Sequence, residues 1–310
     1  MTVIVRPLRP GDPEDAGAFA RIRRTCLPAM LATPASVAYD AAHAHPDAHY
    51  RQLVAVADGE PIGTAQVGIA HDSPKPGQGY ANVYVHPAHE DRGAGTLLLR
   101  TAEEHLAQHG ATQVYCWALE GPRNLAWAAA HGYRRSRSAR FLRLDLTGAA
   151  LPPRRLPPPG VELRTLADFA ADPRPVFALD AEVAADEPGD IALALDDYDH
   201  WLADTWRHPL LDHALTSVAV VDGRPAAFSF AETDGEGRYS SGMTGTARAF
   251  RGRGLAKLAK NDSLHRARAA GVTVAYTGND VDNAPMLAIN QWFGYTLDAT
   301  EIRHVRTLDA

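Results

Sequence analysis

The chain has 310 residues, a formal net charge of −6 and only two cysteines, and 45% of its residues are hydrophobic. This length predicts two domains, because a domain averages about 150 residues. The acidic balance argues against nucleic acid as a partner, and Cys26 and Cys116 are too few for a disulfide framework. No apolar run approaches the roughly 18–20 residues of a membrane span and no signal-peptide pattern opens the chain, so we expect a cytoplasmic protein without a membrane partner.

The first half of the chain predicts alternating strands and helices. A short strand over residues 3–6 precedes a helical stretch, and two strands then meet at Asp58-Gly59, a strong hairpin dipeptide. A strand over 81–85 leads into a glycine-rich turn that opens an amphipathic helix. A short apolar strand over 113–117 follows. The turn reads Glu90-Asp91-Arg92-Gly93-Ala94-Gly95.

The second half repeats this order. Strands are predicted over 161–164, 242–246 and 272–277, and Asp222-Gly223 marks the second hairpin. Its glycine turn is Arg251-Gly252-Arg253-Gly254-Leu255-Ala256, and Gly254 lies 161 residues after Gly93. Other matched segments, such as Gly132-Tyr133 and Gly294-Tyr295, keep the same order with offsets between 158 and 164 residues. The chain is therefore interpreted as a tandem repeat.

A proline-rich segment separates the two copies. Residues 148–160 contain five prolines, which cannot donate backbone hydrogen bonds, so we expect a semi-rigid extended linker. The predicted boundaries are an N-terminal domain over 1–147, the linker over 148–160 and a C-terminal domain over 161–310. Each domain is predicted to be α/β, with helices packed on a mixed sheet.

The glycine turns indicate an anion-binding site. A glycine-rich turn from strand to helix leaves backbone N–H groups uncovered and aims them, with the helix dipole, at a phosphate. A P-loop would need Gly-Lys-Ser/Thr, which neither copy has. A Rossmann turn would follow the first strand of its domain, whereas these turns follow the fourth predicted strand.

A third kind of turn fits both copies. An Arg or Gln, a Gly three residues later and a Gly or Ala five residues later, placed between a strand and a helix, resemble the acetyl-CoA pyrophosphate loop of the GNAT superfamily of N-acetyltransferases. Arg251, Gly254 and Ala256 fill all three positions in the second copy, whereas Glu90 replaces the Arg in the first. Residues 279–295 also resemble the family's Asn…Gly-Phe/Tyr segment. The tandem order is similar to that of double GNAT proteins of the mycothiol synthase type.

The resemblance implies two GNAT-like domains and an N-acyltransferase that uses acetyl-CoA as its acyl donor, without a metal. In this family the amine attacks the thioester directly, and the pantetheine arm lies between the fourth and fifth strands. By position, the expected cofactor contacts in the second copy are Thr244, Gly245, Thr246, Arg251, Gly252, Arg253, Gly254, Leu255, Ala256 and Asn283. In the first copy they are Val83, Tyr84, Val85, Asp91, Arg92, Gly93, Ala94, Gly95 and Thr96.

The expected acid and base of the family are missing. The position of its tyrosine acid, four residues before the Gly of Gly-Tyr, holds Asn290 in the second copy and Ala128 in the first. An amide has no proton to give at neutral pH, so Asn290 is expected only to hydrogen-bond the sulfur or the pantetheine. The fourth-strand glutamate also has no counterpart. Glu232 and Asp280 are the substitute candidates for the base, and each also fits an ordinary surface carboxylate.

Two differences favour the second copy as the catalytic one. Glu90 places a carboxylate near the pyrophosphate, where like charge opposes binding, and Gly121 stands where the second copy has Asn283. We therefore expect a non-catalytic first domain, which can still hold CoA.

Several other features have two interpretations. Eight carboxylates between residues 180 and 199, with no Lys or Arg among them, fit either a solvated face or a surface that recruits a cationic amine. The histidines at 43, 45 and 49 are expected to be solvated rather than to bind a metal. Trp201, Trp206 and Trp292 are expected to pack in the core or at its rim. The acidic residues are Asp180, Glu182, Asp186, Glu187, Asp190, Asp196, Asp197 and Asp199.

The sequence thus predicts an acetyltransferase acting on a primary amine of a small, cationic metabolite. An aminoglycoside-type resistance or biosynthetic acetyltransferase is the alternative among enzymes. A non-catalytic acyl-CoA-binding regulatory protein is the alternative of another class. The chain is expected to be a monomer or a homodimer.

Overall fold

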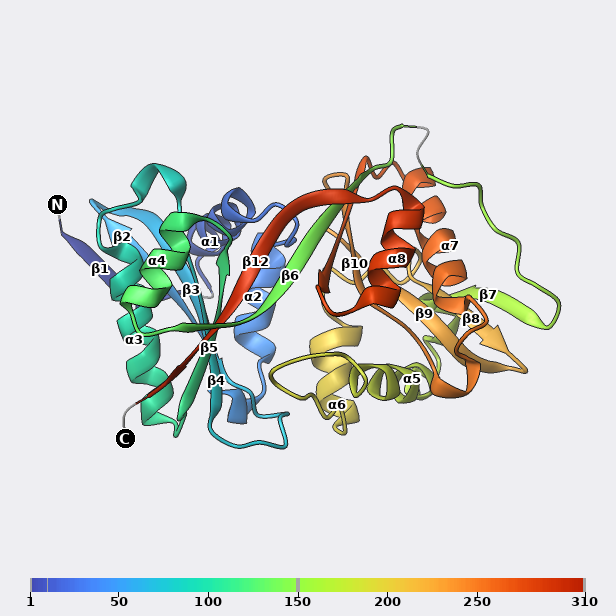
Figure 1. Cartoon of the computed structure of the whole chain (residues 1–310), viewed down its shortest axis with the longest axis horizontal. Helices are drawn as coiled ribbons and strands as arrows, with labels where there is room; N and C mark the ends of the chain where they lie inside the picture. The colour runs from blue at the N-terminus through green and yellow to red at the C-terminus, as the bar shows by residue number, and fades with distance from the viewer. Residues whose placement is uncertain (1, 10, 149–150, 309–310) are drawn as a thin grey trace. The chain divides into compact units, whose positions relative to one another are not determined.

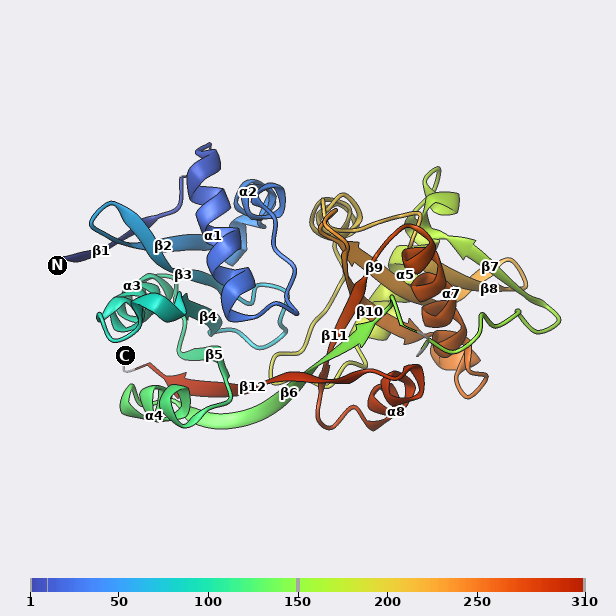
Figure 2. The ribbon, with the colours of Figure 1, turned by 90° about the horizontal axis from the view of Figure 1, so that it is seen from above.

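The computed structural model describes residues 2–9, 11–148 and 151–308, and it divides into two compact units. The first unit comprises Met1–Ala139, Asp190–Ala192 and Ala299–Ala310, and the second comprises Arg140–Gly189 and Leu193–Asp298. Each unit is a mixed sheet with helices packed on it (Figures 1 and 2). This is the mixed α/β fold that the alternating strands and helices predicted.

The sheet of the first unit has the strand order β1-β2-β3-β4-β5-β12. Neighbouring strands are antiparallel except β4 and β5, which run parallel. Asp58 and Gly59 both have positive φ at the hairpin between β2 and β3, as the Asp-Gly pair predicted. The strands are β1 (Val3–Pro7), β2 (Arg51–Ala57), β3 (Glu60–Ile69), β4 (Gln78–Val85), β5 (Gln113–Leu119) and β12 (Thr296–Thr307).

Helix α3 supplies much of the core of the first unit. Its buried residues Leu98, Leu99, Ala102 and Leu106 pack against apolar side chains of the strands, and burying each of the three leucines stabilises the fold by about 1.5–3 kcal/mol. The helices are α1 (Pro13–Cys26), α2 (Pro34–His43), α3 (Ala94–Gln108) and α4 (Pro122–Ala130), with short 3₁₀ turns at Pro46–Ala48 and Pro87–His89.

The sheet of the second unit has the strand order β6-β11-β10-β9-β8-β7. Strands β10 and β11 are parallel, as β4 and β5 are, whereas the pairs β7–β8, β8–β9 and β9–β10 are antiparallel. Residues 134–139 of β6 belong to the first unit and residues 140–145 to the second. The strands are β6 (Arg134–Asp145), β7 (Val161–Thr165), β8 (Ser217–Val221), β9 (Arg224–Thr233), β10 (Arg238–Thr246) and β11 (Val274–Asp280).

Helix α7 of the second unit is buried on all sides over one stretch, because residues 258–264 are each less than 5% exposed. The other helices of this unit pack around the sheet, and Trp201 and Trp206 are buried in its core, whereas Trp292 is 40% exposed. The helices are α5 (Arg174–Ala184), α6 (Tyr198–Trp201), α7 (Leu255–Ala269) and α8 (Ala284–Phe293), with a π-helical turn at Leu202–Trp206 and 3₁₀ turns at Leu166–Phe169 and Arg248–Phe250.

The two units do not follow the linear boundaries 1–147, 148–160 and 161–310 predicted from the repeat. Each copy ends in a long strand after its last helix, and these strands are exchanged: β6 of the first copy enters the second sheet, and β12 of the second copy enters the first sheet. Residues 301–307 of β12 pair with β5 over its whole length. A repeat in the sequence shows which elements correspond, but not which sheet each strand joins.

The described part of the proline-rich segment is extended and lies along α7. The backbone N–H of Arg155 donates to Asn261 Oδ1 at 2.7 Å, and Arg154 bonds to the buried carboxylate of Asp262. Leu151 is buried in the apolar core of the second unit. The segment therefore acts as a cover for a polar helix face as well as a connection; residues 149–150 of the predicted linker lie outside the described part.

Candidate active sites

A cavity of about 810 Å³ in the second unit lies where β10 and β11 separate. The two strands pair in parallel from Arg238↔Val274 to Ser241↔Thr277 and are unpaired beyond that point. Of the predicted contacts, Arg253 does not line this cavity, and those that do are Thr244, Gly245, Thr246, Arg251, Gly252, Gly254, Leu255, Ala256 and Asn283.

The glycine turn of the second unit presents backbone N–H groups to this cavity. Gly252 and Gly254 have φ of 77° and 72°, a left-handed conformation that glycine adopts without strain. Gly254 is the N-cap of α7, and no side chain caps that helix end. The N–H groups of the first turn therefore remain available to an anion. A side chain on Gly254 would meet no atom within 4 Å.

The arginine of the turn is held at the cavity wall by an acidic residue. Arg251 and Arg248 both form ion pairs with Asp186, at 2.7 Å for Arg248. These two arginines hold the pKa of Asp186 down at about 2, so its carboxylate stays ionised at neutral pH. Arg251 is thereby pre-positioned, although part of its charge is neutralised before any phosphate arrives.

A β-bulge in β10 forms part of the wall of this cavity. Ser241 pairs with Ala231 and Thr244 pairs with Ser229, so β10 has one residue more than β9 over this stretch. Gly242 and Met243 both line the cavity and fall outside the regular register. Because a bulge leaves backbone groups outside the ladder, it offers donors to a carbonyl placed in the cavity.

Glu232 lies beside this bulge. A Cβ atom built on Gly242 would be 3.0 Å from Glu232 Oε1, so the carboxylate lies against a residue of the cavity wall. Burial raises the pKa of Glu232, and nearby His208 partly opposes the rise. A raised pKa brings a carboxylate closer to the range in which it can accept a proton from an amine.

None of the three candidates for catalysis is itself among the lining residues, and the other two are engaged elsewhere. Asp280 Oδ1 accepts from the backbone N–H of Asp282 at 2.8 Å and so fixes the turn before α8. Asn290 is fully buried: its Oδ1 accepts from Lys260 Nζ at 2.7 Å, and its Nδ2 donates to Asn279 Oδ1 at 2.5 Å. Asn279 does line the cavity. The sequence reasoning did not identify Lys260.

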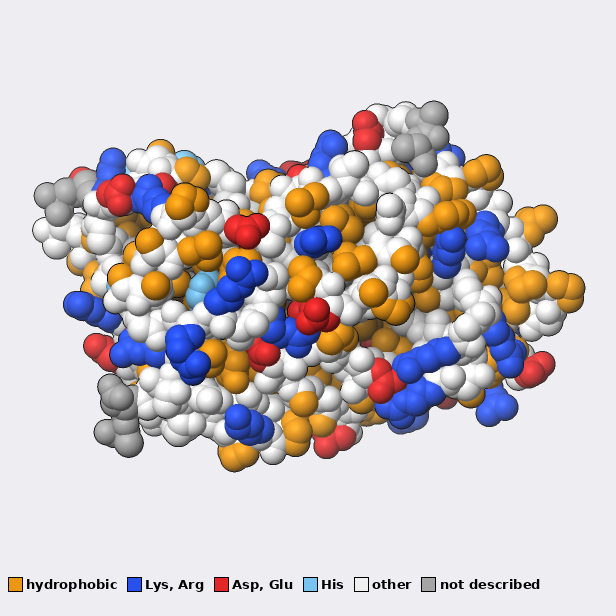
Figure 3. All heavy atoms as spheres, viewed as in Figure 1, with side chains coloured by type: hydrophobic (Ala, Val, Ile, Leu, Met, Phe, Trp, Pro, Cys, Tyr) orange, Lys and Arg blue, Asp and Glu red, His pale blue; other side chains and the backbone are white. Residues whose placement is uncertain are grey.

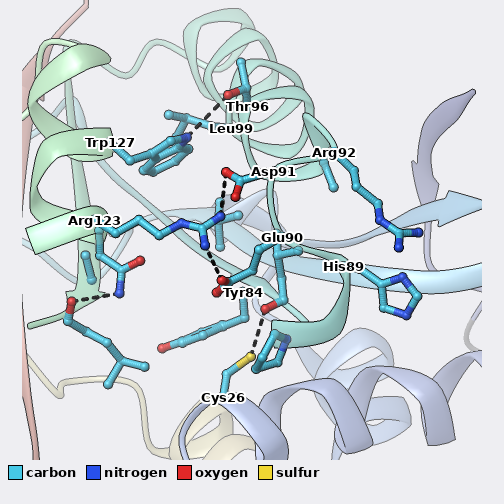
Figure 4. A pocket seen from close by; sticks show the side chains of 18 of the residues that line it. Cys26, Tyr84, His89, Glu90, Asp91, Arg92, Thr96, Leu99, Arg123 and Trp127 are labelled. Atoms are coloured by element: carbon cyan, nitrogen blue, oxygen red, sulfur yellow. Dashed lines mark hydrogen bonds and ion pairs between the residues drawn. The ribbon is translucent and has the colours of Figure 1, made fainter. Parts of the chain in front are cut away.

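The first unit has a smaller cavity of about 570 Å³ in the corresponding place. Arg123, at the start of α4, extends across it and pairs with Glu90 at 2.5 Å and with Asp91 at 2.7 Å (Figure 4). The predicted contacts of this copy all line the cavity: Val83, Tyr84, Val85, Asp91, Arg92, Gly93, Ala94, Gly95 and Thr96.

Two further features distinguish the first cavity. Strand β4 pairs with β3 without a bulge, from Gly63↔Val85 to Ile69↔Gly79. The hydroxyl of Tyr84 donates to Glu301 Oε1 at 3.2 Å, and burial raises the pKa of Glu301 to about 7. Glu301 comes from the exchanged strand β12, so the linear repeat gave no reason to place it here.

The acidic run between residues 180 and 199 is not one solvated face. Asp180 is buried and accepts from Trp201 Nε1 at 2.8 Å, and burial raises its pKa to about 6. Asp190 belongs to the first unit and accepts from Ser136 Oγ. Asp186 and Glu187 are the members that line the second cavity. Glu182 accepts from the backbone N–H of Arg248, and Asp197 caps α6.

No described helix is long and apolar enough to cross a membrane. Within residues 2–9, 11–148 and 151–308, no group of three or more His, Cys, Asp or Glu side chains could hold a metal ion. The histidines at 43, 45 and 49 are thus not gathered around a common point. His43 and His45 stack on Tyr39 and His71, respectively.

The sequence and the fold both match known acetyltransferases. A model of the acetyltransferase (GNAT) family matches residues 18–133. The mycothiol acetyltransferase of Kineococcus radiotolerans is 31% identical over 263 residues, which cover 83% of this chain and 82% of the relative. That of Nocardiopsis dassonvillei is 27% identical over 290 residues, with coverages of 86% and 85%.

Two solved structures share the fold over nearly the whole chain. A GCN5-related N-acetyltransferase from Sphaerobacter thermophilus has a TM-score of 0.72 at 23% identity and covers 98% of this chain and 95% of its own. A tandem GNAT protein from the clavulanic acid biosynthesis pathway has a TM-score of 0.73 at 21% identity, with coverages of 100% and 99%. The predicted tandem GNAT fold and N-acetyltransferase activity are confirmed, and the chain belongs to the GNAT family of acetyltransferases.

Proposed function

We propose that this enzyme transfers the acetyl group of acetyl-CoA to a primary amine of a small metabolite, and that the second unit performs the transfer. The observation that carries the proposal is the combination of an uncapped glycine turn, the bulge of β10 and the half-buried carboxylate of Glu232, which lies against Gly242 of the cavity wall. The first cavity has the turn but lacks the bulge.

The residues around the mouth of the second cavity fit the charged end of acetyl-CoA. The N–H groups at the start of α7 face the pyrophosphate, and Arg251 adds a guanidinium. Lys257 lines the cavity, and its ammonium lies 3.6 Å from the ring centroid of Trp292. Arg155 lies over the same ring at 5.9 Å. In Figure 3, Lys and Arg side chains gather over the end of the second unit that carries α7.

Lys257 and Arg155 form a site for a second phosphate. Neither makes an ion pair with any described carboxylate, and burial, followed by the positive charge of Arg155, lowers the pKa of Lys257. Two uncompensated cations beside an exposed indole suit a phosphorylated nucleoside, whose base can stack on the ring. We assign them to the 3′-phosphoadenosine end of the donor.

Glu232 is the proposed general base. An ammonium acceptor must lose a proton before its nitrogen can attack the thioester carbonyl, and a carboxylate with a raised pKa suits this transfer. The backbone of the bulge at Gly242 and Met243 is the proposed donor to the developing oxyanion. Asp280 is less suited, because its carboxylate is engaged in the turn before α8.

The acceptor is proposed to be a small amine that is cationic in solution. Glu187 and Asp282 both line the second cavity and favour a positively charged group. Relatives named mycothiol acetyltransferase support a small-molecule acceptor over a protein substrate. The first unit is proposed to be non-catalytic, since Glu90 and Asp91 place two carboxylates at its turn and engage the positive charge of Arg123.

A thiol-release screen tests this proposal. Purified full-length enzyme is incubated with acetyl-CoA and a panel of small amines that includes the amine substrate of the mycothiol acetyltransferases, and free CoA is measured. We expect amine-dependent release that Glu232→Gln abolishes. Release that persists in Glu232→Gln and in Gly254→Glu would place the reaction outside the second cavity and would contradict the proposal.

A further inference from the structure

Lys260 is a fully buried lysine without a carboxylate partner among the described residues. It lies on α7 and is 0% exposed. Its Nζ donates to Asn290 Oδ1 at 2.7 Å and to Thr277 Oγ1 at 3.3 Å, and the ring centroid of Tyr295 is 5.1 Å away. No ion pair of Lys260 occurs within the part of the chain that the structure describes. The neighbouring carboxylate of Asp262 is bonded instead to Arg154, Arg266 and Ser217.

Such a lysine is not explained by stability. Burying an ammonium without a counter-charge is unfavourable, so an apolar side chain of similar shape would serve packing better. Loss of hydration lowers the pKa of Lys260 to about 7, and no charged group acts on it. Burial raises the pKa of Tyr295 well above its ordinary value, so this neighbouring hydroxyl stays neutral while Lys260 titrates.

The surroundings of Lys260 lead to the second cavity. Thr277 stands at the last paired position of β11, where β10 and β11 separate, and it lines the cavity. Asn279, two residues further along β11, also lines the cavity and is held by Asn290. Asn290 occupies the position at which the family's tyrosine acid was expected. The lysine thus lies directly behind the wall from which an acid was missing.

We propose that Lys260 supplies the proton for the leaving thiolate through the hydroxyl of Thr277. This inference rests on the proposed function, in which the second cavity binds acetyl-CoA and performs the transfer. Asn290 is then a positioning residue: its Oδ1 holds the ammonium of Lys260, and its Nδ2 holds Asn279.

The proton transfer balances as follows. The amine nitrogen forms a bond to the thioester carbonyl carbon after Glu232 has taken one proton from the ammonium, and the nitrogen gives its second surplus proton to water as the tetrahedral intermediate collapses. When the carbon–sulfur bond breaks, its electron pair stays on sulfur. Thr277 gives its hydroxyl proton to that sulfur and receives one from Lys260, which becomes a neutral amine. After the products leave, Glu232 releases its proton to water and Lys260 regains one, so one proton is released per turnover and water is the only other participant.

Lys260→Met and Thr277→Val test the relay, since each removes one group with little change in volume. We expect kcat to fall at least about tenfold in both variants, while the Kd of acetyl-CoA changes less than about threefold. In the unmodified enzyme kcat should fall as the pH rises through about 7, because Lys260 loses its proton there. Both variants should lose this alkaline decline, and Thr277→Ser, which keeps the hydroxyl, should retain it.

Lys75→Met is the matched control. Lys75 lies in the first unit, where its Nζ donates to Gln113. The Lys75→Met substitution should therefore leave kcat and the pH dependence of kcat unchanged. Thermal unfolding of each variant separates loss of the relay from loss of the fold. The inference is overturned if folded Lys260→Met or Thr277→Val keeps kcat and the alkaline decline. If Glu232→Gln and Gly254→Glu also leave turnover intact, the proposed function itself has failed; if they abolish turnover, only the relay is refuted.

Discussion

The two cavities of this protein are built on the same order of strand, glycine turn and helix, yet the charged side chains beside the two turns differ. In the second unit Gly252 and Gly254 leave an uncapped helix end, with Arg251 at its side. In the first unit Glu90 and Asp91 occupy the turn, and Arg123 neutralises them from α4. The turn fixes where the backbone donors point, but the charges of the side chains beside it determine whether binding of an anion is favourable.

The strands above the turns differ as well. The bulge in β10 opens the ladder at Gly242 and Met243, whereas β4 keeps a regular ladder with β3. The first cavity nonetheless has its own buried carboxyl, Glu301, bonded to Tyr84. A duplicated fold thus carries two cavities, and we propose that acyl transfer takes place in the second.

The largest expected effect comes from placing a carboxylate in the second turn. Gly254→Glu should abolish acetyl-CoA binding in that unit and turnover with it, because a bulky anion would face the pyrophosphate. Gly254→Ala is the control: it carries the same left-handed φ, with a strain of about 1–3 kcal/mol, but no charge. Calorimetry and CoA release measure both. Gly93→Glu should leave turnover largely intact, and its loss in a folded protein would reverse the assignment of the units.

Glu232→Gln should lower kcat about a hundredfold or more, since general-base catalysis typically contributes 10²- to 10⁴-fold. In the unmodified enzyme kcat/KM should fall as the pH drops through the raised pKa of this carboxyl, because the protonated form cannot accept the amine proton. The acidic decline of kcat/KM should therefore have its midpoint above the ordinary pKa range of a glutamate. Asp280→Asn should change kcat less than about threefold, and a larger loss there would exchange the roles of the two carboxylates.

Glu90→Gln should increase the affinity of the first cavity for CoA about three- to tenfold. The change leaves Arg123 with one carboxylate instead of two, so more of its charge faces a phosphate. The measurement is CoA calorimetry in the Gly254→Glu background, where the second cavity no longer binds. Arg123→Ala in the same background should act in the opposite direction. An affinity indifferent to both changes would mean that phosphate does not approach this turn.

Removing the proposed 3′-phosphate site should cost a smaller factor. Arg155→Ala combined with Lys257→Ala should raise the KM of acetyl-CoA about fivefold and leave that of acetyl-dephospho-CoA nearly unchanged. The ratio of the two KM values isolates the 3′-phosphate from the rest of the donor. If both donors lose affinity equally, the two cations act on the pyrophosphate or on the fold instead.

The smallest effects should separate Asp186 from Glu187. Asp186→Asn releases Arg251 from its ion pair, so the KM of acetyl-CoA should fall about twofold while that of the acceptor stays constant. Glu187→Gln should instead raise the KM of the acceptor about two- to threefold, as should added salt. If both variants change both KM values in the same way, the two carboxylates act through a shared electrostatic potential and have no separate roles.

The sequence predicted the parts of this molecule that depend on local pattern. Both Asp-Gly hairpins, the strands before the turns and the helices after them follow from dipeptide and periodicity signals. The pairing of Arg123 with Glu90 joins residues 33 positions apart, and no spacing rule indicates such a contact. Lys260 was equally hidden. Residues 258–264 of α7 are all buried, although four of them are polar. An amphipathic pattern assigns polar residues to the solvent-exposed face, so it could not reveal that Lys260 is buried.

The exchanged strands have a consequence for how the chain acquires its structure during synthesis. The edge of β5, which ends at Leu119, is paired by residues 301–307, which the ribosome adds more than 180 positions later (301 − 119 = 182). Until then the first sheet ends in an unpaired strand, a surface that favours pairing with another chain. A fragment cut at residue 147 would keep this open edge permanently. Shortening the last strand should therefore damage the part of the protein that is made first.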